Sequence, residues 1–365
     1  MDFQSRQKKL REHLATTRFD ALLISHLPNI RYLCGFTGSA GFLLVDEAGS
    51  VFFTDVRYDT QAHEEVSAAK VVVARTSVLE ALGESLARRK RRRKWTVGIE
   101  AEHFTIAEKK RLAKLRPSGV NLKDAPPVVE RARMIKDADE LERIRAAVAV
   151  GAKLYDRALE VLRAGVKETE VAAEMELAAR RAGAEEMSFP TIIASGVRSA
   201  LPHGRASNQA VPRGGFVVCD FGVILIGYCS DQTRTVWVGE VPGKAPEDAR
   251  RAYEAVREAQ QAAIDVVRPG IPVGDVDEAA RKILRKAGVG RYFTHSTGHG
   301  VGLEIHEAPR VAAGQREILR PGMVITIEPG VYFPGKWGVR IEDMVAVTAS
   351  GCDVLTPTSK DFLAV

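Results

Sequence analysis

The first 120 residues alternate between two patterns of hydrophobic and polar positions. Short apolar runs rich in β-branched and aromatic residues predict strands, and stretches with helical periodicity separate some of them. This alternation predicts an α/β layer domain. The predicted helices cover residues 3–18, 57–67, 77–91 and 105–115. The predicted strands are ALLIS (21–25), GFLLV (41–45), SVFFTD (50–55), VVVAR (71–75) and WTVGIE (95–100).

The segment KDAPPVVERARMIKD (123–137) breaks this alternation. Pro126 and Pro127 disfavour helix, and the residues that follow them are strongly charged. We therefore predict an N-terminal domain of residues 1–125 and a C-terminal domain of residues 126–365.

The C-terminal domain contains an internal repeat. RAGVKETEVAAEMELAARRAGA (163–184) aligns without a gap to RPGIPVGDVDEAARKILRKAGV (268–289) at an offset of 105 residues. Each copy reads as a turn, a helix and a closing Ala-Gly, and each follows another predicted helix. The repeat predicts two similar halves with helices on one face of a shared sheet. The alternative explanation is that the two segments acquired similar turn and helix-capping residues independently.

Carboxylates interrupt the apolar strands predicted for that sheet. The acids are Asp220, Asp231, Glu328 and Glu342. A buried, unpaired carboxylate is costly, so each needs a cation, a donor or a proton. The expected strands are TIIAS (191–195), GFVVCDFGVIL (215–225), GYCSDQTRTVWVG (227–239), MVITIEPGVYF (323–333) and GVRIEDMVAV (338–347).

The spacing of these acids predicts that they meet. A hairpin turn near Leu225 to Gly227 would bring Asp220 and Asp231 together, and Arg340 and Glu342 would share one side of a strand. Several converging carboxylates repel one another unless divalent cations hold them, and oxygen-rich sites suit Mn²⁺. For any single acid, a structural pair with an arginine explains the position equally well.

Histidines indicate the same region. His295, His299 and His306 fall within HSTGHGVGLEIH, where the glycines allow close backbone packing. One histidine with four carboxylates is typical of a two-metal hydrolytic site, which acidifies a water and polarises a carbonyl. A phosphate-cradling loop is the alternative for GHGVG, but its strand–loop–helix context is absent. His203, in LPHGRAS, also reads as an ordinary loop histidine.

Charge and cysteine content change this picture little. The net charge is +6, but the run RRKRRRK (88–94) holds seven bases, so the rest of the chain has a net charge of 6 − 7 = −1. A solvated helix end explains the run better than a nucleic-acid contact, because no aromatic interleaving accompanies it. The four cysteines form no CxxC pair and are expected to be reduced. No apolar run approaches about 20 residues, and the N-terminus is polar, so we expect a cytoplasmic protein.

At these residues the chain closely resembles the aminopeptidase P and prolidase family, the Xaa-Pro metallopeptidases. DFG, SDQTRT, HSTGHGVGLEIHE, TIEPG and GVRIED occur in the family's order. NIRYLCGFTGSAGFLLV and FTDVRYDTQA resemble the family's N-terminal domain, especially that of small bacterial aminopeptidases P. The resemblance covers essentially the whole chain. It implies a creatinase-type α/β domain followed by a pseudosymmetric pita-bread catalytic domain.

The resemblance also implies a role for each site residue. Asp220 would hold one of two divalent metal ions, His299 and Glu328 the other, and Asp231 and Glu342 would bridge them. A hydroxide between the metals would attack the carbonyl before proline, with Glu328 handling the proton. The substrate and the tetrahedral intermediate would be held by the remaining catalytic residues, His203, His295, His306 and Arg340. Mn²⁺ is the expected metal, with Co²⁺ and Zn²⁺ as alternatives.

Several related functions compete with this interpretation. Methionine aminopeptidases share the ligand set but lack the N-terminal domain and the pair His295 and Arg340. Creatinase-like relatives work without metal and do not preserve the ligands, and non-catalytic binding relatives have no use for them. An Xaa-Pro aminopeptidase is favoured over a prolidase restricted to dipeptides by the N-terminal sequence. The expected partners are proline-containing peptides and a second copy of the chain in a homodimer, with neither nucleic acid nor membrane.

Overall fold

The computed structural model describes residues 1–88, 94–239 and 245–365, and these divide into two compact units. Unit 1 is Met1–Arg133 and unit 2 is Met134–Val365. The predicted division after residue 125 stays a proposal. Of the basic run at 88–94, residues 89–93 lie outside the described residues. None of the described helices is long and apolar enough to span a membrane.

Unit 1 is built on one mixed sheet of six strands in the order β4-β3-β2-β1-β5-β6. Its strands are β1 (Ala21–Ile24), β2 (Phe42–Asp46), β3 (Gly49–Asp55), β4 (Lys70–Ala74), β5 (Trp95–Glu100) and β6 (Val120–Ala125). Its helices are α1 (Phe3–Ala15), α2 (Leu27–Cys34), α3 (Asp59–Glu65), α4 (Val78–Arg88), α5 (Ile106–Leu115) and α6 (Val128–Arg133), with a 3₁₀ turn η1 (Val56–Tyr58).

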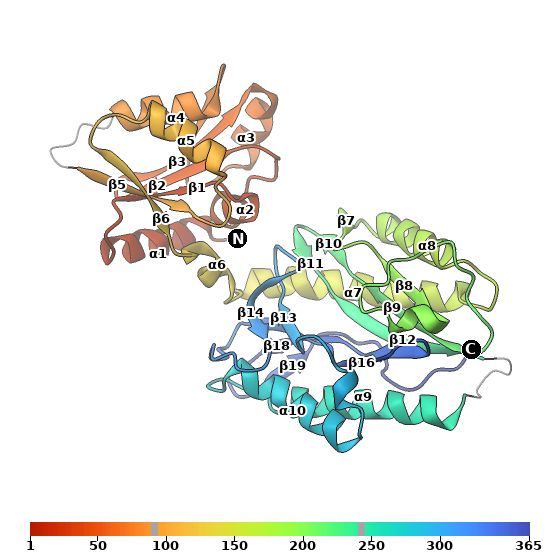
Figure 1. Ribbon diagram of the computed structural model, residues 1–365. Coiled ribbons are helices and arrows are strands. Elements are labelled where there is room, and N and C mark those ends of the chain that lie inside the picture. Colours follow the sequence, from red (N-terminus) through yellow and green to blue (C-terminus); the bar gives the residue numbers. More distant parts are fainter. Residues whose placement is uncertain (89–93, 240–244) are drawn as a thin grey trace. The chain divides into compact units, whose positions relative to one another are not determined.

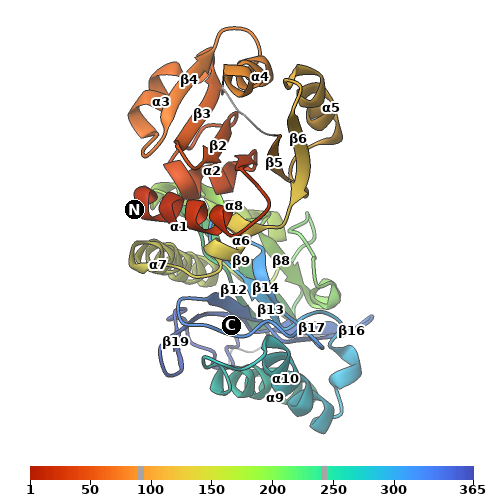
Figure 2. The ribbon, with the colours of Figure 1, turned by 90° about the vertical axis from the view of Figure 1, so that its left-hand side faces the viewer.

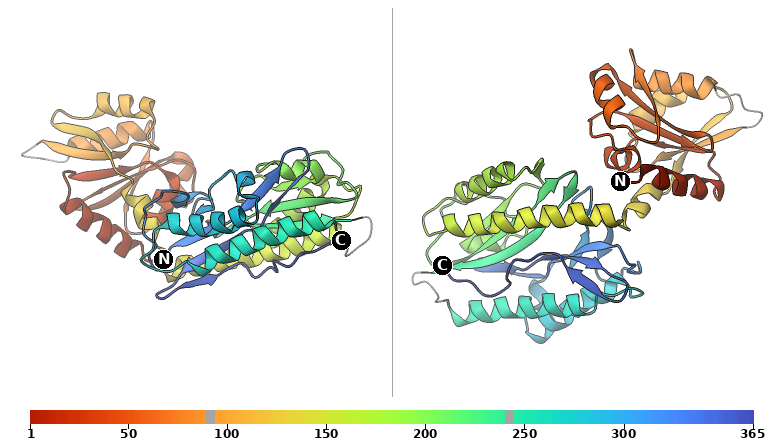
Figure 3. Two further views of the ribbon diagram at one scale, coloured as in Figure 1. Left: turned by 60° about the horizontal axis from the view of Figure 1, so that its bottom comes forward. Right: turned by 180° about the vertical axis from the view of Figure 1, so that it is seen from behind.

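Both faces of the sheet in unit 1 carry helices. Figures 1 and 3 show α4 and α5 on one face and α1 on the other. Leu82 and Leu86 of α4 and Leu112 of α5 pack against strand residues in one core. All five predicted strands of this region are present, whereas α2 and β6 were not predicted. Helix α6 stays with unit 1 because Arg133 donates from Nη1 to Oδ1 of buried Asn29 on α2, at 2.7 Å.

The sequence repeat in unit 2 is also a structural repeat. Helices α8 (Glu168–Arg181) and α10 (Val273–Lys286) have the same length and begin 105 residues apart. The turn before each holds a glycine with positive φ, Gly165 at 89° and Gly270 at 90°, which only glycine adopts readily. The helices before them are α7 (Ala138–Val161) and α9 (Glu247–Asp265). Strands lie between the pair α7–α8 and the pair α9–α10 (Figures 1 and 2).

Each helix pair packs on strands of its own half. Val171 and Met175 of α8 share a core with Ile193, Val217 and other residues of the first half. The second core holds residues of α9, α10 and the later strands, joined by Phe216 and Trp237 from the first half. The early strands are β7 (Glu186–Met187), β8 (Ile192–Ser195), β9 (Gly215–Phe221), β10 (Val223–Leu225), β11 (Tyr228–Cys229) and β12 (Gln232–Val238). The later strands are β13 (Gly298–Gly300), β14 (Glu307–Val311), β15 (Val324–Ile327), β16 (Gly330–Phe333), β17 (Trp337–Arg340), β18 (Asp343–Val347) and β19 (Cys352–Val354).

The single shared sheet expected from the repeat is divided in the structure. Among the described residues the strands form the sheets β11-β10-β7, β12-β9-β8, β14-β13-β15-β18-β19 and β16-β17. An isolated bridge between Thr233 and Glu342 joins the two halves. Four of the long predicted strands are each broken in two, and Asp231, Glu328 and Glu342 lie at or beside three of these breaks. There the backbone leaves one sheet for another, which places the acids at the junction of the halves.

Candidate active site

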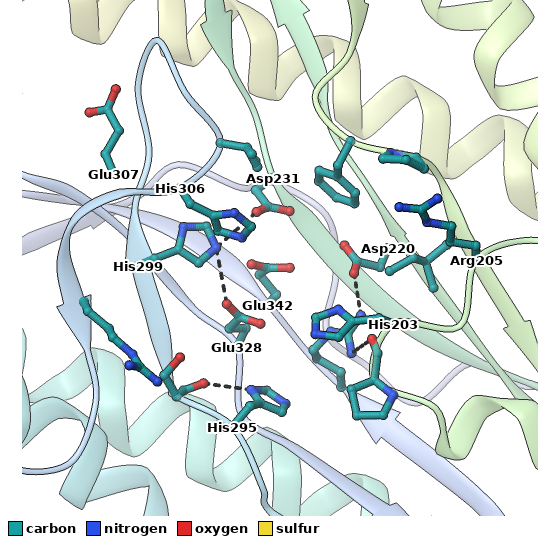
Figure 4. Close-up of a pocket in the computed structure, with 18 residues that line it drawn as sticks. His203, Arg205, Asp220, Asp231, His295, His299, His306, Glu307, Glu328 and Glu342 are labelled. Carbon is teal, nitrogen blue, oxygen red and sulfur yellow. Dashed lines mark hydrogen bonds and ion pairs between the residues drawn. The ribbon is translucent and has the colours of Figure 1, made fainter. Parts of the chain in front are cut away.

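The nine residues predicted from sequence line one cavity of about 590 Å³ in unit 2. Figure 4 shows their side chains approaching it from strands and loops of both halves. They are His203, Asp220, Asp231, His295, His299, His306, Glu328, Arg340 and Glu342. The structure therefore brings the predicted set together, while the role of each residue stays a proposal.

Backbone pairing between the halves places the acids. Asp220 lies on β9 opposite Thr233 of β12, in antiparallel register. Thr233 accepts a hydrogen bond at its carbonyl from the Glu342 N–H, at 3.1 Å, and donates from Oγ1 to Glu342 Oε2, at 2.7 Å. Asp231 lies just before β12. The predicted hairpin is present, with Ile226 and Gly227 as the two turn residues. One threonine thus connects acids from distant parts of the chain.

Three side chains are close enough together to hold a metal ion. Ligand atoms of Asp231, His299 and Glu342 lie within 4.8 Å of one another. His299 Nε2 is also 3.4 Å from Glu328 Oε1. Oδ1 of buried Asp231 has no hydrogen-bond partner within the described part of the chain. A buried carboxylate oxygen without a partner is costly, and a divalent cation would remove that cost. The residues present therefore fit a metal centre.

Burial and mutual repulsion disfavour ionised carboxylates here. Burial, followed by repulsion from Glu342, raises the pKa of Asp231 well above its ordinary value. Burial and then Glu328 raise the pKa of Glu342 in the same direction. Burial raises the pKa of Glu328 to about 8. These carboxylates need positive charge to ionise together near neutral pH, and a pair of divalent ions would supply it.

The His299 ring is held neutral, with Nε2 near Asp231 and Glu328. Its Nδ1 lies 3.0 Å from the Gly300 carbonyl, which can only accept, so Nδ1 carries the proton. Burial lowers the pKa of His299 to about 4, so the ring stays neutral and Nε2 offers a lone pair toward the acids. The flanking glycines are required, because a Cβ on Gly298 would lie 2.0 Å from the Thr326 carbonyl oxygen.

A hydrogen-bonded chain runs along another wall of the cavity. Arg340 Nη1 donates to the Tyr332 hydroxyl at 2.7 Å, and that hydroxyl lies 2.9 Å from His295 Nε2. His295 Nδ1 donates to the Ser296 carbonyl at 2.8 Å, so Nε2 accepts from Tyr332. Burial, with Arg340 second, lowers the pKa of His295 to about 4. Sequence reasoning missed Tyr332, because an aromatic residue in an apolar strand looks like part of the core.

Arg340 connects the two halves at the cavity. Its guanidinium is ion-paired with Asp220 and donates to Thr233 Oγ1 and to the Pro202 carbonyl. The two remaining histidines are both exposed: His306 packs edge-on to His299 with ring centroids 4.4 Å apart, and His203 lies on a loop. Sequence reasoning also missed the cations Arg205 and Arg310 and the apolar residues Phe189, Ile192 and Ile305, which line the cavity.

Comparison with known proteins identifies the class. Residues 142–349 match the model of Metallopeptidase family M24, and residues 6–135 match the Creatinase/Prolidase N-terminal domain. The chain therefore belongs to metallopeptidase family M24. The expected architecture, a creatinase-type domain followed by a pita-bread catalytic domain, is confirmed.

Individual relatives are similar over their whole length. An Xaa-Pro dipeptidase of Pyrococcus horikoshii is 38% identical over 98% of both chains. The solved structure of an Xaa-Pro dipeptidase from Bacillus anthracis is 34% identical, with a TM-score of 0.94 over 100% of both chains. An X-Pro aminopeptidase structure from Thermotoga maritima is 33% identical, with a TM-score of 0.89 over 99% of this chain and 100% of that one. Both specificities are thus present among similar proteins.

Proposed function

We propose that this chain is a two-metal peptidase that hydrolyses Xaa-Pro bonds. The observation that carries the proposal is that ligand atoms of Asp231, His299 and Glu342 lie within 4.8 Å of one another, while the buried Oδ1 of Asp231 has no hydrogen-bond partner among the described residues. Asp231 and Glu342 would bridge the two ions, Asp220 would hold one, and His299 with Glu328 would hold the other. When bound, the ions supply a Lewis acid for the scissile carbonyl and a water of lowered pKa.

The other cavity residues would position the substrate and move protons. Glu328 would take a proton from the attacking water and pass it to the prolyl nitrogen. His295, fixed by Tyr332, and His203 and His306 would hold the substrate and the tetrahedral intermediate. Arg340 would hold Asp220 in place. Mn²⁺ is the proposed metal, because hard carboxylate oxygens dominate the ligand set.

The shape of proline supports this specificity. An Xaa-Pro bond has no N–H, and the ring fixes φ, so a protease that grips the N–H of an extended substrate loses a contact. A cavity with apolar walls at Phe189, Pro190 and Ile192 can receive the ring directly.

Dipeptides are proposed as the first substrates to test. Arg205 and Arg310 place two guanidinium groups on the cavity wall, and a guanidinium recognises a free carboxylate such as the C-terminus of a dipeptide. The relatives support a dipeptidase at least as well as they support the aminopeptidase that the N-terminal sequence favours. The aminopeptidase activity on longer peptides is the second candidate, supported by the similarity to the Thermotoga maritima structure.

The test is hydrolysis of Ala-Pro, Ala-Pro-Ala and Ala-Ala by protein loaded with Mn²⁺, with and without EDTA. Cleavage of Ala-Pro alone, lost in EDTA, is the expected result. Cleavage of Ala-Pro-Ala as well would establish the aminopeptidase candidate. Cleavage of neither proline peptide by protein that holds its metal would refute the proposed specificity. The homodimer stays a prediction, which light scattering after gel filtration would check.

A further inference from the structure

The loop that carries His203 into the cavity is long and passes over the surface. It begins at Ser195, the last residue of β8, includes the 3₁₀ turn η2 (Gly196–Ala200), and ends at Ser207. Its cavity-lining residues are Pro202, His203 and Arg205. A long surface loop with an exposed histidine needs a constraint if that histidine is to act at a fixed place.

One buried carboxylate closes both ends of this loop. Glu168, in the first turn of α8, is fully buried at 0% exposure. Its Oε1 accepts from the N–H and the hydroxyl of Ser195, both at 2.8 Å. Its Oε2 accepts from the N–H of Ser207 at 3.1 Å and from its hydroxyl at 2.7 Å. The two serines are thereby held on opposite oxygens of a single side chain.

An arginine inside the loop completes the arrangement. Arg198 Nε lies 3.1 Å from Glu168 Oε2, and its Nη2 donates to the Arg205 carbonyl at 2.7 Å. Charge-assisted hydrogen bonds of this kind are roughly twice as strong as neutral ones. The carboxylate therefore has a cation and four further donors, which offsets the cost of burying it. Arg198 thus connects Glu168, at the base of the loop, to Arg205, which lines the cavity.

Glu168 is not among the residues that line the cavity, whereas three residues of the loop that it holds are. We propose that Glu168 is a positioning residue, which with Arg198 fixes His203 and the Pro202 carbonyl at the active site. The Pro202 carbonyl accepts from Arg340 Nη1 at 3.0 Å, so this loop also meets the residue that holds Asp220. The inference rests on the proposed function.

Glu168→Gln is the most informative change. The amide keeps one accepting oxygen but presents N–H groups where Arg198 and Ser207 now donate, so donors would face donors. We expect kcat/KM for Ala-Pro to fall about tenfold or more, since small misplacements of a catalytic group are costly. The metal content of the variant should be unchanged. The matched control is Glu174→Gln on the same helix, which breaks an ion pair with Arg157 and should leave activity within about twofold.

A double-mutant cycle separates positioning from simple destabilisation. If Glu168 acts through His203 and the Pro202 carbonyl, then Glu168→Gln should lower activity clearly less in the presence of His203→Ala than it does alone. Independent effects that multiply in the double variant would overturn the proposal. An inactive wild-type protein would instead refute the proposed function, and the loop would then be judged by a readout that needs no turnover.

That second readout is backbone hydrogen exchange of residues 196–206, followed by mass spectrometry. Glu168→Gln should speed exchange there, whereas Glu174→Gln should not. If Glu168→Gln does not fold, Ser207→Ala removes one of the donors and should give a smaller increase in the same segment. Exchange in 196–206 that neither variant alters would overturn the proposal.

Discussion

The two halves of unit 2, residues 134–239 and 245–365, share helix geometry but hold their histidines differently. In the first half, Glu168 in the first turn of α8 closes a long loop that presents exposed His203. In the second half, Asp277 of α10 accepts from the N–H and hydroxyl of Thr297, between His295 and His299. Arg281 pairs with Asp277 and donates to the His295 carbonyl at 2.6 Å.

This difference shows what the repeat specifies. The turn and the helix recur at an offset of 105 residues, but the two buried acids are 277 − 168 = 109 residues apart. Scaffold positions therefore repeat, whereas the residues that hold the site do not. Each half uses a buried carboxylate with an arginine beside it, but Glu168 and Asp277 occupy different positions in their helices. The halves are then joined at the cavity by Thr233, Glu342 and Arg340.

Removing one of the two proposed bridging acids, Asp231 or Glu342, should abolish peptide hydrolysis. We expect Asp231→Asn or Glu342→Gln to lower turnover of Ala-Pro by about 10³-fold or more, because the Lewis acid contributes several kcal/mol. Turnover and metal per chain, measured by mass spectrometry, would check this. Near-normal turnover with full metal content in either variant would disprove the bridging role.

A buried ion pair ties the start of unit 2 to the second half. Lys136 Nζ lies 3.1 Å from Glu307 Oε2, with side chains only 1% and 6% exposed. Lys136→Met should destabilise the chain by about 3–5 kcal/mol, since it removes one partner of a buried pair. Urea unfolding would measure the change. The control Lys109→Met breaks an exposed pair with Asp124 and should cost about 0–1 kcal/mol; equal losses in the two variants would contradict the account.

His295 should differ from the proposed metal ligands in the effect of its removal. We expect His295→Ala to lower kcat/KM by about 10²-fold while the metal stays bound, because its ring bonds to Tyr332 and not to the acids. Tyr332→Phe should give a smaller loss in the same direction. Loss of metal from His295→Ala would mean that the ligand histidine has been misassigned.

The metal-free protein should become less stable as pH rises from 6.5 to 8. The pKa of Glu328 is raised from 4.5 to about 8, so the folded chain holds protons that the unfolded chain releases. The pKa values of His295 and His299 are lowered to about 4 and that of His306 is also lowered, and their opposite effect is largely complete by about pH 7.5, so the fall in stability is steepest above that pH. Urea unfolding at pH 6.5 and 8 would show the decrease.

Metal should reverse this trend, because binding requires deprotonated carboxylates and strengthens with pH. The same urea unfolding of metal-loaded protein should therefore give equal or greater stability at pH 8. A metal-free protein whose stability rises over this range would show that the buried acids are already ionised without the ions.

Sequence alone predicted much of this site because its signals are local. Acids within apolar runs and histidines among glycines are visible without a fold, whereas His203 was included only because of the family resemblance; all nine predicted residues line the cavity. The breaks in the strands at Asp231 and Glu342 were not visible, because they follow from the passage between separate sheets. Glu168 was missed because the two serines that bind it lie 27 and 39 residues further along the chain. Tyr332 was missed because its partners Arg340 and His295 lie 8 and 37 residues away. An acid on a helix and an aromatic residue in a strand are ordinary until those contacts form.

The most direct test of the central claim is anomalous diffraction from crystals of the protein loaded with Mn²⁺. The account predicts two ions in the cavity, both in contact with Asp231 and Glu342. Asp220 should complete one of them, and His299 with Glu328 the other. A single ion that Asp220 does not contact, or ions bound outside this cavity, would contradict the claim that the two halves jointly build a two-metal centre.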